Sequence, residues 1–128
     1  MNAALDAWAV VALLDGTEPA ASRVQEVLDQ QRPIMSWINA GEVYSILRRN
    51  EGEAEATVVV RELRNVAALE LPSDRRVLEA AALKAQHPLS YADAFAAATA
   101  IGNGATLLTG DPELLAPDAP WRCEDLQA

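Results

Sequence analysis

The chain has 128 residues, of which 51% are hydrophobic and 23% are charged, and its formal net charge is −9 at pH 7. This length fits a single domain over residues 1–128 with a core of its own, and the composition excludes a disordered chain. One cysteine excludes an internal disulfide, and we expect neither a membrane span nor a signal peptide, so the expected location is cytoplasmic.

Short apolar runs alternate with amphipathic segments, and Gly and Pro residues separate them. In the first half, the spacing of apolar residues predicts strands at 3–5 and 34–37 and helices at 8–14, 20–31, 38–49 and 53–64. In the second half, it predicts strands at 66–71 and 105–109, helices at 73–86 and 90–101, and a last edge strand within 121–126. This alternation predicts an α/β fold with a central parallel sheet between two helical layers, a three-layer α/β/α sandwich.

Four acidic residues stand where such a fold gathers its functional site, which is the edge formed by the carboxyl ends of the strands. Asp6, Glu42 and Asp111 each come after a predicted strand. Asp93 opens the helix at 90–101, in which no other residue ionises near pH 7. A helix so apolar is normally buried, and a buried carboxylate must be paired, protonated or bound to a metal. These four acids are therefore the candidate site residues.

Each of these acids also has a structural interpretation as part of a helix start. Asp6 and Asp111 are suited to cap helices, and a proline at the first helical position follows Asp111. Glu42 and Asp93 stand three residues after a capping side chain, which is the spacing of a capping box. Taken singly, each acid is weak evidence for a site, so the inference depends on the four together.

Four carboxylates that share a cleft raise one another's pKa values, and a divalent cation relieves their repulsion. Oxygen ligands without a cluster of histidines or cysteines favour Mg²⁺ or Mn²⁺ over zinc. Such an ion can activate water and stabilise charge on a phosphoryl group. The pattern therefore predicts hydrolysis of phosphodiester bonds, with one or two ions held by Asp6, Glu42, Asp93 and Asp111.

The stretches around the four acids resemble the motifs of PIN-domain ribonucleases, in the same order and spacing. The matching stretches are Leu5-Asp6-Ala7-Trp8-Ala9, Asn39-Ala40-Gly41-Glu42-Val43 with Leu47-Arg48-Arg49, Ser90-Tyr91-Ala92-Asp93-Ala94-Phe95-Ala96-Ala97-Ala98-Thr99-Ala100, and Leu108-Thr109-Gly110-Asp111-Pro112-Glu113-Leu114. Within that family the chain resembles VapC-type toxins of toxin–antitoxin pairs. One departure is Ala7, which stands where many members have Thr or Ser.

This resemblance implies a Mg²⁺- or Mn²⁺-dependent endoribonuclease that cleaves cellular RNA and restrains growth. It implies that Asp6, Glu42, Asp93 and Asp111 are both the metal ligands and the catalytic residues. It also implies a homodimer and inhibition by a small cognate antitoxin protein. The acidic net charge opposes RNA binding, so we expect arginines such as Arg48 and Arg49, or those of a dimer partner, to contact the RNA.

Two other functions remain open. An acid after a strand near the N-terminus and a Gly-Asp pair near the C-terminus are also found in haloacid-dehalogenase-like phosphatases. Those enzymes need a second Asp two places after the first, and Trp8 stands at that place. The second alternative is a PIN-fold domain without catalytic activity that serves as a binding module, which the presence of all four acids disfavours.

Overall fold

Five short strands form one fully parallel sheet in the order β3-β2-β1-β4-β5 in the computed structural model, which describes residues Met1–Ala128. The strands are β1 (Ala3–Leu5), β2 (Ile34–Ser36), β3 (Ala68–Glu70), β4 (Thr106–Thr109) and β5 (Cys123–Asp125). In the register of the central strand, Ala4 lies opposite Ile34 on one side and Leu107 on the other. The carboxyl ends of all five strands therefore lie along one edge.

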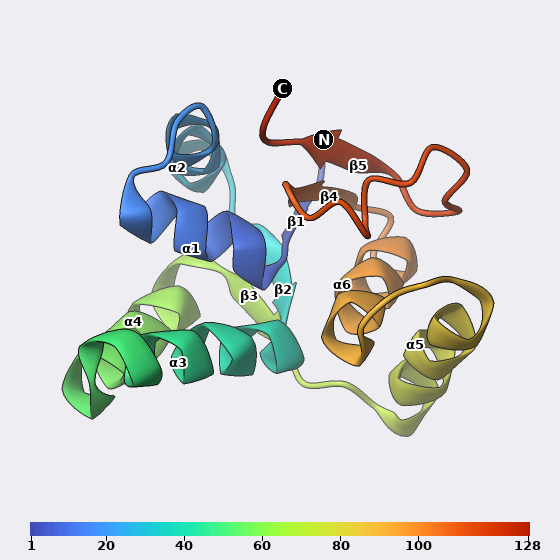
Figure 1. Cartoon of the computed structure of the whole chain (residues 1–128), viewed down its shortest axis with the longest axis horizontal. Helices are drawn as coiled ribbons and strands as arrows, with labels where there is room; N and C mark the ends of the chain where they lie inside the picture. Colours follow the sequence, from blue (N-terminus) through green and yellow to red (C-terminus); the bar gives the residue numbers. More distant parts are fainter.

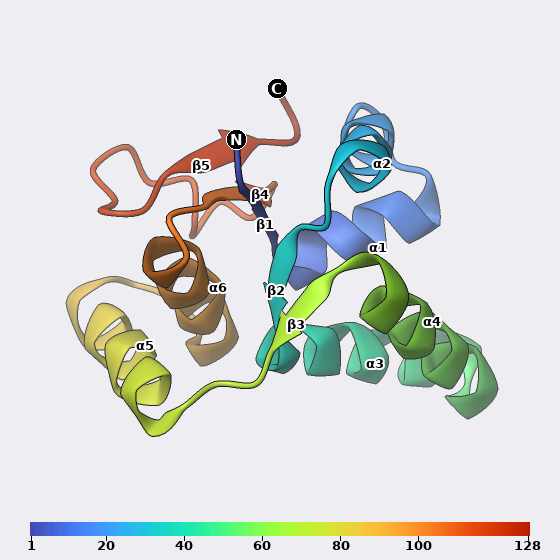
Figure 2. The same cartoon turned by 180° about the vertical axis from the view of Figure 1, so that it is seen from behind.

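Six helices cover the two faces of this sheet, as Figure 1 shows. They are α1 (Ala7–Asp15), α2 (Ala20–Gln30), α3 (Trp37–Glu51), α4 (Glu53–Val66), α5 (Asp74–Gln86) and α6 (Tyr91–Gly102). The pair α5 and α6 packs on one face, and the other four helices pack on the opposite face (Figures 1 and 2). The expected three-layer α/β/α sandwich with a parallel sheet is confirmed.

The strand residues divide between two hydrophobic clusters, because successive side chains of a strand point to opposite faces. Leu5, Met35 and Leu108 belong to the cluster under α1 to α4. Ala4 and Leu107 belong to the cluster under α5 and α6. Both faces of the central strands are thus buried, which explains why these strands read as continuous apolar runs.

The predicted elements are present within one or two residues of their expected ends, while the structural interpretation of Asp111 as a helix cap is wrong. The strand predicted at 34–37 ends at Ser36, whose Oγ accepts a hydrogen bond from Ile38 N at 3.1 Å and caps α3. No helix starts at Asp111, because residues 111–114 form a turn after β4. None of the helices combines the length and the apolar character that crossing a bilayer requires.

Candidate metal centre

The four acids predicted from the sequence line one pocket of about 340 Å³ between α1, α3, α6 and the turn after β4. Asp6 and Asp111 follow adjacent parallel strands, while Glu42 and Asp93 come from the first two turns of helices. The sheet topology brings together residues that lie as far apart in the sequence as Asp6 and Asp111. This convergence is the feature that the spacing of the motifs predicts.

Asp6 both caps α1 and faces the pocket. Its Oδ1 accepts a hydrogen bond from Ala9 N at 2.8 Å, and its Oδ2 accepts one from the hydroxyl of Thr109. The side chain is buried, and burial raises the pKa of Asp6 from 3.8 to about 7, against the lowering effect of both hydrogen bonds. Asp111 and Glu42 raise this pKa further by repulsion. Helix capping and a place in the site are therefore compatible at this residue.

Asp93 lies in the first turn of α6, but its side chain does not accept the hydrogen bond from Ser90 N that would complete a capping box. Ser90 Oγ accepts a hydrogen bond from Asp93 N at 3.1 Å, but Ser90 N donates to Glu113 Oε1 at 3.4 Å rather than to Asp93. The carboxylate of Asp93 is thus left to face the pocket. Burial, followed by the neighbouring Asp111 and Glu113, holds the pKa of Asp93 well above its ordinary range.

Glu42 lies inside α3 rather than at its start, because that helix begins at Trp37. The capping-box interpretation of Glu42 is therefore wrong. Asn39, which is fully buried, donates from Nδ2 to Glu42 Oε1 and to the carbonyl of Ala92, both at 3.0 Å. One amide thus connects a carboxylate of α3 to the residue that precedes Asp93. Burial raises the pKa of Glu42, and the hydrogen bond from Asn39 opposes this rise.

Asp111 lies in the turn after β4, and Thr109 connects it to Asp6. Thr109 Oγ1 accepts a hydrogen bond from Asp111 N at 3.0 Å while its hydroxyl donates to Asp6. Asp111 Oδ1 accepts from Glu113 N at 3.0 Å, which is the pattern of an Asx turn rather than a helix cap. The expected hydroxyl beside the first acid, absent at Ala7, is thus supplied by Thr109 from the adjacent strand.

A fifth acid, Glu113, forms the tightest group of carboxylates with Asp93 and Asp111, whereas Asp6 and Glu42 line the same pocket outside this group. The sequence did not single out Glu113. One carboxylate oxygen from each of Asp93, Asp111 and Glu113 lies within 4.8 Å of the others. The sequence signal was only its place two residues after Asp111. The contacts of Asn39 with Ala92 and of Thr109 with Asp6 had no local signal, because these partners lie 53 and 103 residues away in the chain.

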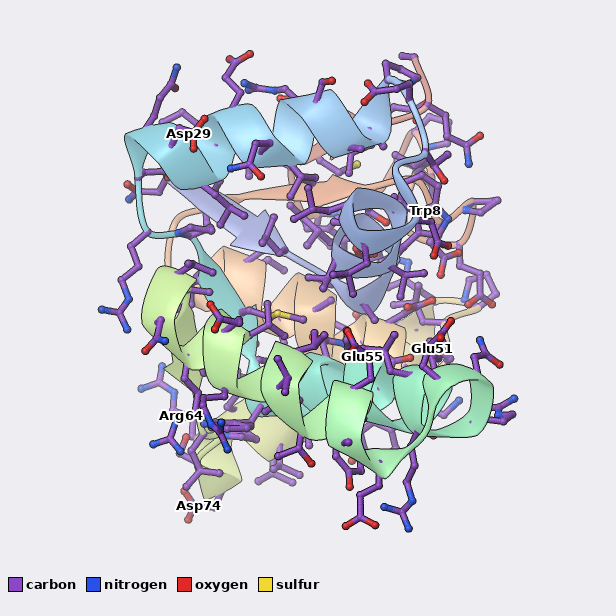
Figure 3. All side chains as sticks on the ribbon, turned by 90° about the vertical axis from the view of Figure 1, so that its left-hand side faces the viewer. Trp8, Asp29, Glu51, Glu55, Arg64 and Asp74 are labelled. Atoms are coloured by element: carbon purple, nitrogen blue, oxygen red, sulfur yellow. The ribbon has the colours of Figure 1, made fainter.

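The donor chemistry of the pocket fits a hard divalent cation. Its lining holds carboxylates but no Lys, Arg, His or Cys to balance or replace them. Oxygen-only donor sets of this kind suit Mg²⁺ or Mn²⁺. The lining also includes the apolar side chains of Trp8, Val11 and Ile46. Trp8, labelled in Figure 3, packs so closely on Gly110 that no side chain fits there. Trp8 is thus a wall of the pocket rather than only a core anchor.

We expect that replacing Asn39 by Leu weakens Mn²⁺ binding by about 10- to 100-fold, the range seen when a group that orients a metal ligand is lost. The physical reason is that Glu42 loses the hydrogen bond that fixes its carboxylate beside the other acids. Titration calorimetry with Mn²⁺ on the purified variant measures the effect.

Asn103→Leu is the matched control. Asn103 Nδ2 also donates to a glutamate, Glu70 at 3.1 Å, and to a helix carbonyl, that of Thr99 at 2.8 Å. Both substitutions therefore remove the same two kinds of bond, but only one does so at the pocket. Equal Mn²⁺ affinities in the two variants would show that Asn39 has no role in placing Glu42.

Comparisons with known proteins agree with this arrangement. The family model described as the PIN domain matches residues 3–119. No curated protein sequence matches the chain. Among solved structures, VapBC-1 from nontypeable Haemophilus influenzae is 21% identical with a TM-score of 0.75, covering 100% of both chains. DNA-bound VapBC from Salmonella typhimurium is 16% identical with a TM-score of 0.76, covering 98% of both chains.

A third similar structure is VapC20 from Mycobacterium tuberculosis, described as a toxin that cleaves the sarcin–ricin loop. It is 18% identical with a TM-score of 0.73, and the match covers 88% of this chain and 92% of that one. At these identities the structures establish a shared fold. Together with the family match over most of its length, this agreement identifies the chain as a member of the PIN domain family.

Proposed function

We propose that this protein is a Mg²⁺- or Mn²⁺-dependent endoribonuclease and the toxin of a toxin–antitoxin pair. The observation that carries the proposal is the convergence of Asp6, Glu42, Asp93 and Asp111 in one pocket with no basic residue to balance them. Bare carboxylates would repel a phosphodiester, so a cation is needed for the substrate to enter. Membership of the PIN domain family supports the same activity.

The four acids would hold the ion, and Glu113 is close enough to Asp93 and Asp111 to join them. When bound, such an ion activates water and neutralises charge on the phosphoryl group that is attacked. Thr109 fixes the relative positions of Asp6 and Asp111, and Asn39 fixes Glu42. These contacts hold the ligands in place before the substrate arrives, which limits the reorganisation needed during reaction.

The proposed partners are cellular RNA, a cognate antitoxin protein and a second copy of the chain, all in the cytoplasm. The antitoxin is supported by the solved structures of similar fold, several of which are VapBC complexes. A homodimer is supported by exposed apolar side chains near α5, where Leu71 is 79% and Leu78 is 70% exposed. Apolar side chains that protrude this far are often covered in an assembly.

Incubation of the purified chain with total cellular RNA tests the proposal. With Mg²⁺ or Mn²⁺ we expect discrete fragments on a denaturing gel, and with a chelator we expect intact RNA. Restoring the metal after chelation should restore cleavage, because the loss comes from the missing ion and not from unfolding. RNA that stays intact at millimolar concentrations of either ion would contradict the proposal.

The same preparation separates the two alternative functions. A phosphomonoesterase would release phosphate from a model monoester while the RNA stays intact, although Trp8 stands where that class needs its second Asp. A binding module without activity would leave both substrates unchanged and would still bind its partner protein. Both results differ from metal-dependent fragmentation of RNA.

A further inference from the structure

Two hollows on the outer face of the α3–α4 pair share Tyr44 and concentrate positive charge. The first is lined by Tyr44, Ser45, Arg48 and Arg49, and the second by Trp37, Tyr44, Thr57, Val60, Arg61 and Arg64. No acid lines either hollow, although the chain has 19 Asp and Glu against 10 Lys and Arg. We call Trp37, Tyr44, Arg48, Arg49, Arg61 and Arg64 the arginine surface.

The charges of α4 are only partly segregated around its axis, because Glu53, at the start of the helix, lies on the same side as the arginines. At 100° per residue, Arg61 and Arg64 share the face that lines the second hollow, while Glu55 and Glu62 lie seven residues apart on another face. Figure 3 shows Arg64 and Glu55 on different sides of the helix. The arginine surface is therefore positive even though α4 carries both signs of charge.

Most guanidinium groups of the arginine surface are free to bind an external anion. Only Arg48 forms an ion pair, with Glu53 at 3.3 Å, and no carboxylate lies within 4.0 Å of the other three guanidinium groups. Aromatic neighbours hold two of the arginines in place. Arg64 lies 5.8 Å from the centre of the Trp37 ring, and Arg48 Nη1 donates to the Tyr44 hydroxyl at 3.1 Å.

One member of the arginine surface, Arg49, lies beside the metal centre on α3. Arg49 stands seven residues after Glu42, so the two lie on nearly the same side of the helix, about 10 Å apart along its axis. Figures 1 and 2 show α3 and α4 as a pair, with the start of α3 beside α6 and with α4 away from both α5 and α6. Arg48 and Tyr44 lie about 120° and 160° around α3 from Glu42, so a strand that leaves the pocket past Arg49 would turn around the exposed side of α3 to reach the rest of the arginine surface.

We propose that the arginine surface binds the sugar–phosphate backbone of single-stranded RNA next to the bond that is cleaved. Arginine forks match phosphate oxygens, and aromatic side chains among them provide places for unpaired bases to stack. An acidic polypeptide could also pair with these arginines, but it would gain nothing from their closeness to a site that cleaves phosphodiester bonds. The inference rests on the proposed function, and it explains how a chain of net charge −9 attracts RNA.

The test measures binding of an unstructured single-stranded RNA by fluorescence anisotropy, in chelator, over a series of salt concentrations. The double variant Arg61→Ala with Arg64→Ala should bind this RNA more weakly. Each phosphate contact with a single strand contributes about 0.7 to the slope of log affinity against log salt, so the loss of two contacts should make that slope shallower by about 1.4. The control, Arg75→Ala with Arg122→Ala, makes the same charge change at other exposed positions and should keep the wild-type slope.

Equal slopes in the two double variants would overturn the proposal. It would also be overturned if Arg61→Ala with Arg64→Ala lost binding of polyglutamate but kept binding of RNA, because the surface would then serve an acidic protein. Chelator keeps the RNA intact, so the binding result holds even if the chain proves to have no nuclease activity. Where cleavage is seen, an oligonucleotide too short to reach the arginine surface should be cut equally by both double variants.

Discussion

Substituting Asn for Asp93 is expected to lower RNA cleavage by more than about 100-fold, since even groups that only orient a metal ligand contribute about 10- to 100-fold. The same substitution is expected to stabilise the metal-free protein. Burial, followed by the neighbouring Asp111 and Glu113, holds the pKa of Asp93 high, so the folded metal-free protein disfavours its charged form. Neutral Asn has nearly the same shape and avoids this cost. Thermal unfolding in chelator and in Mg²⁺ measures the second effect.

The two conditions should give opposite orders of stability. In chelator, Asp93→Asn should melt above the wild type. In Mg²⁺, the wild type should melt above the variant, because only an intact ligand set gains stability from bound metal. Asp29→Asn is the control, since Asp29 is exposed on α2 and lies outside the pocket. A variant that cleaves RNA normally and melts like Asp29→Asn in both conditions would exclude Asp93 from the metal site.

The stability of the metal-free protein is expected to fall as the pH rises from about 4 to about 8, the interval that spans the ordinary pKa of Asp6 and its raised value near 7. A folded-state pKa above the ordinary value means that folding favours the protonated form. The stability contributed by this form is complete below pH 4 and is lost as the pH passes the raised pKa. For Asp6 the loss is at most of the order of 4 kcal/mol, at about 1.4 kcal/mol per pH unit.

Bound Mg²⁺ should reverse this pH dependence. Metal ligands must be deprotonated, so metal affinity rises with pH and binding releases protons. Differential scanning calorimetry at several pH values, with chelator or Mg²⁺, gives both trends, and each kcal/mol corresponds to roughly 3–5 °C for a chain of this size. Titration calorimetry at pH 6 in buffers of different ionisation enthalpy counts the released protons. Proton release near zero would contradict the raised pKa values.

The order of elements and the layers of the fold could be predicted from apolar spacing and from Gly and Pro punctuation. The main failure was the capping-box interpretation of Glu42, which places the start of α3 at Asn39. Ser36 and Asn39 are both good capping residues, and only tertiary contacts distinguish them. Because Asn39 lies inside the helix and donates across the molecule, the local capping-box pattern at Glu42 was misleading.

The acids of the site were predictable to different degrees. Asp93 stood out because it is the only acidic or basic side chain on an otherwise largely apolar helix, and burial without a basic partner followed from that pattern. Glu113 was missed because its position depends on the turn at Asp111. The local sequence Asp111-Pro112 fits a helix start as well as it fits this turn. Thr109 was missed because its partner, Asp6, lies on the neighbouring strand, and strand pairing is not readable from either segment alone.

The double role of Asp6 limits how this position can change during evolution. In a lineage that no longer needed the nuclease, selection would no longer maintain a carboxylate at position 6. Helix α1 would still need a side chain there that accepts a hydrogen bond from Ala9 N. Replacement by an aliphatic residue costs about 0.5–2 kcal/mol at such a cap, whereas Asn or Ser costs little. Inactive descendants of this chain should therefore carry Asn, Ser or Thr at position 6 more often than Ala or Val.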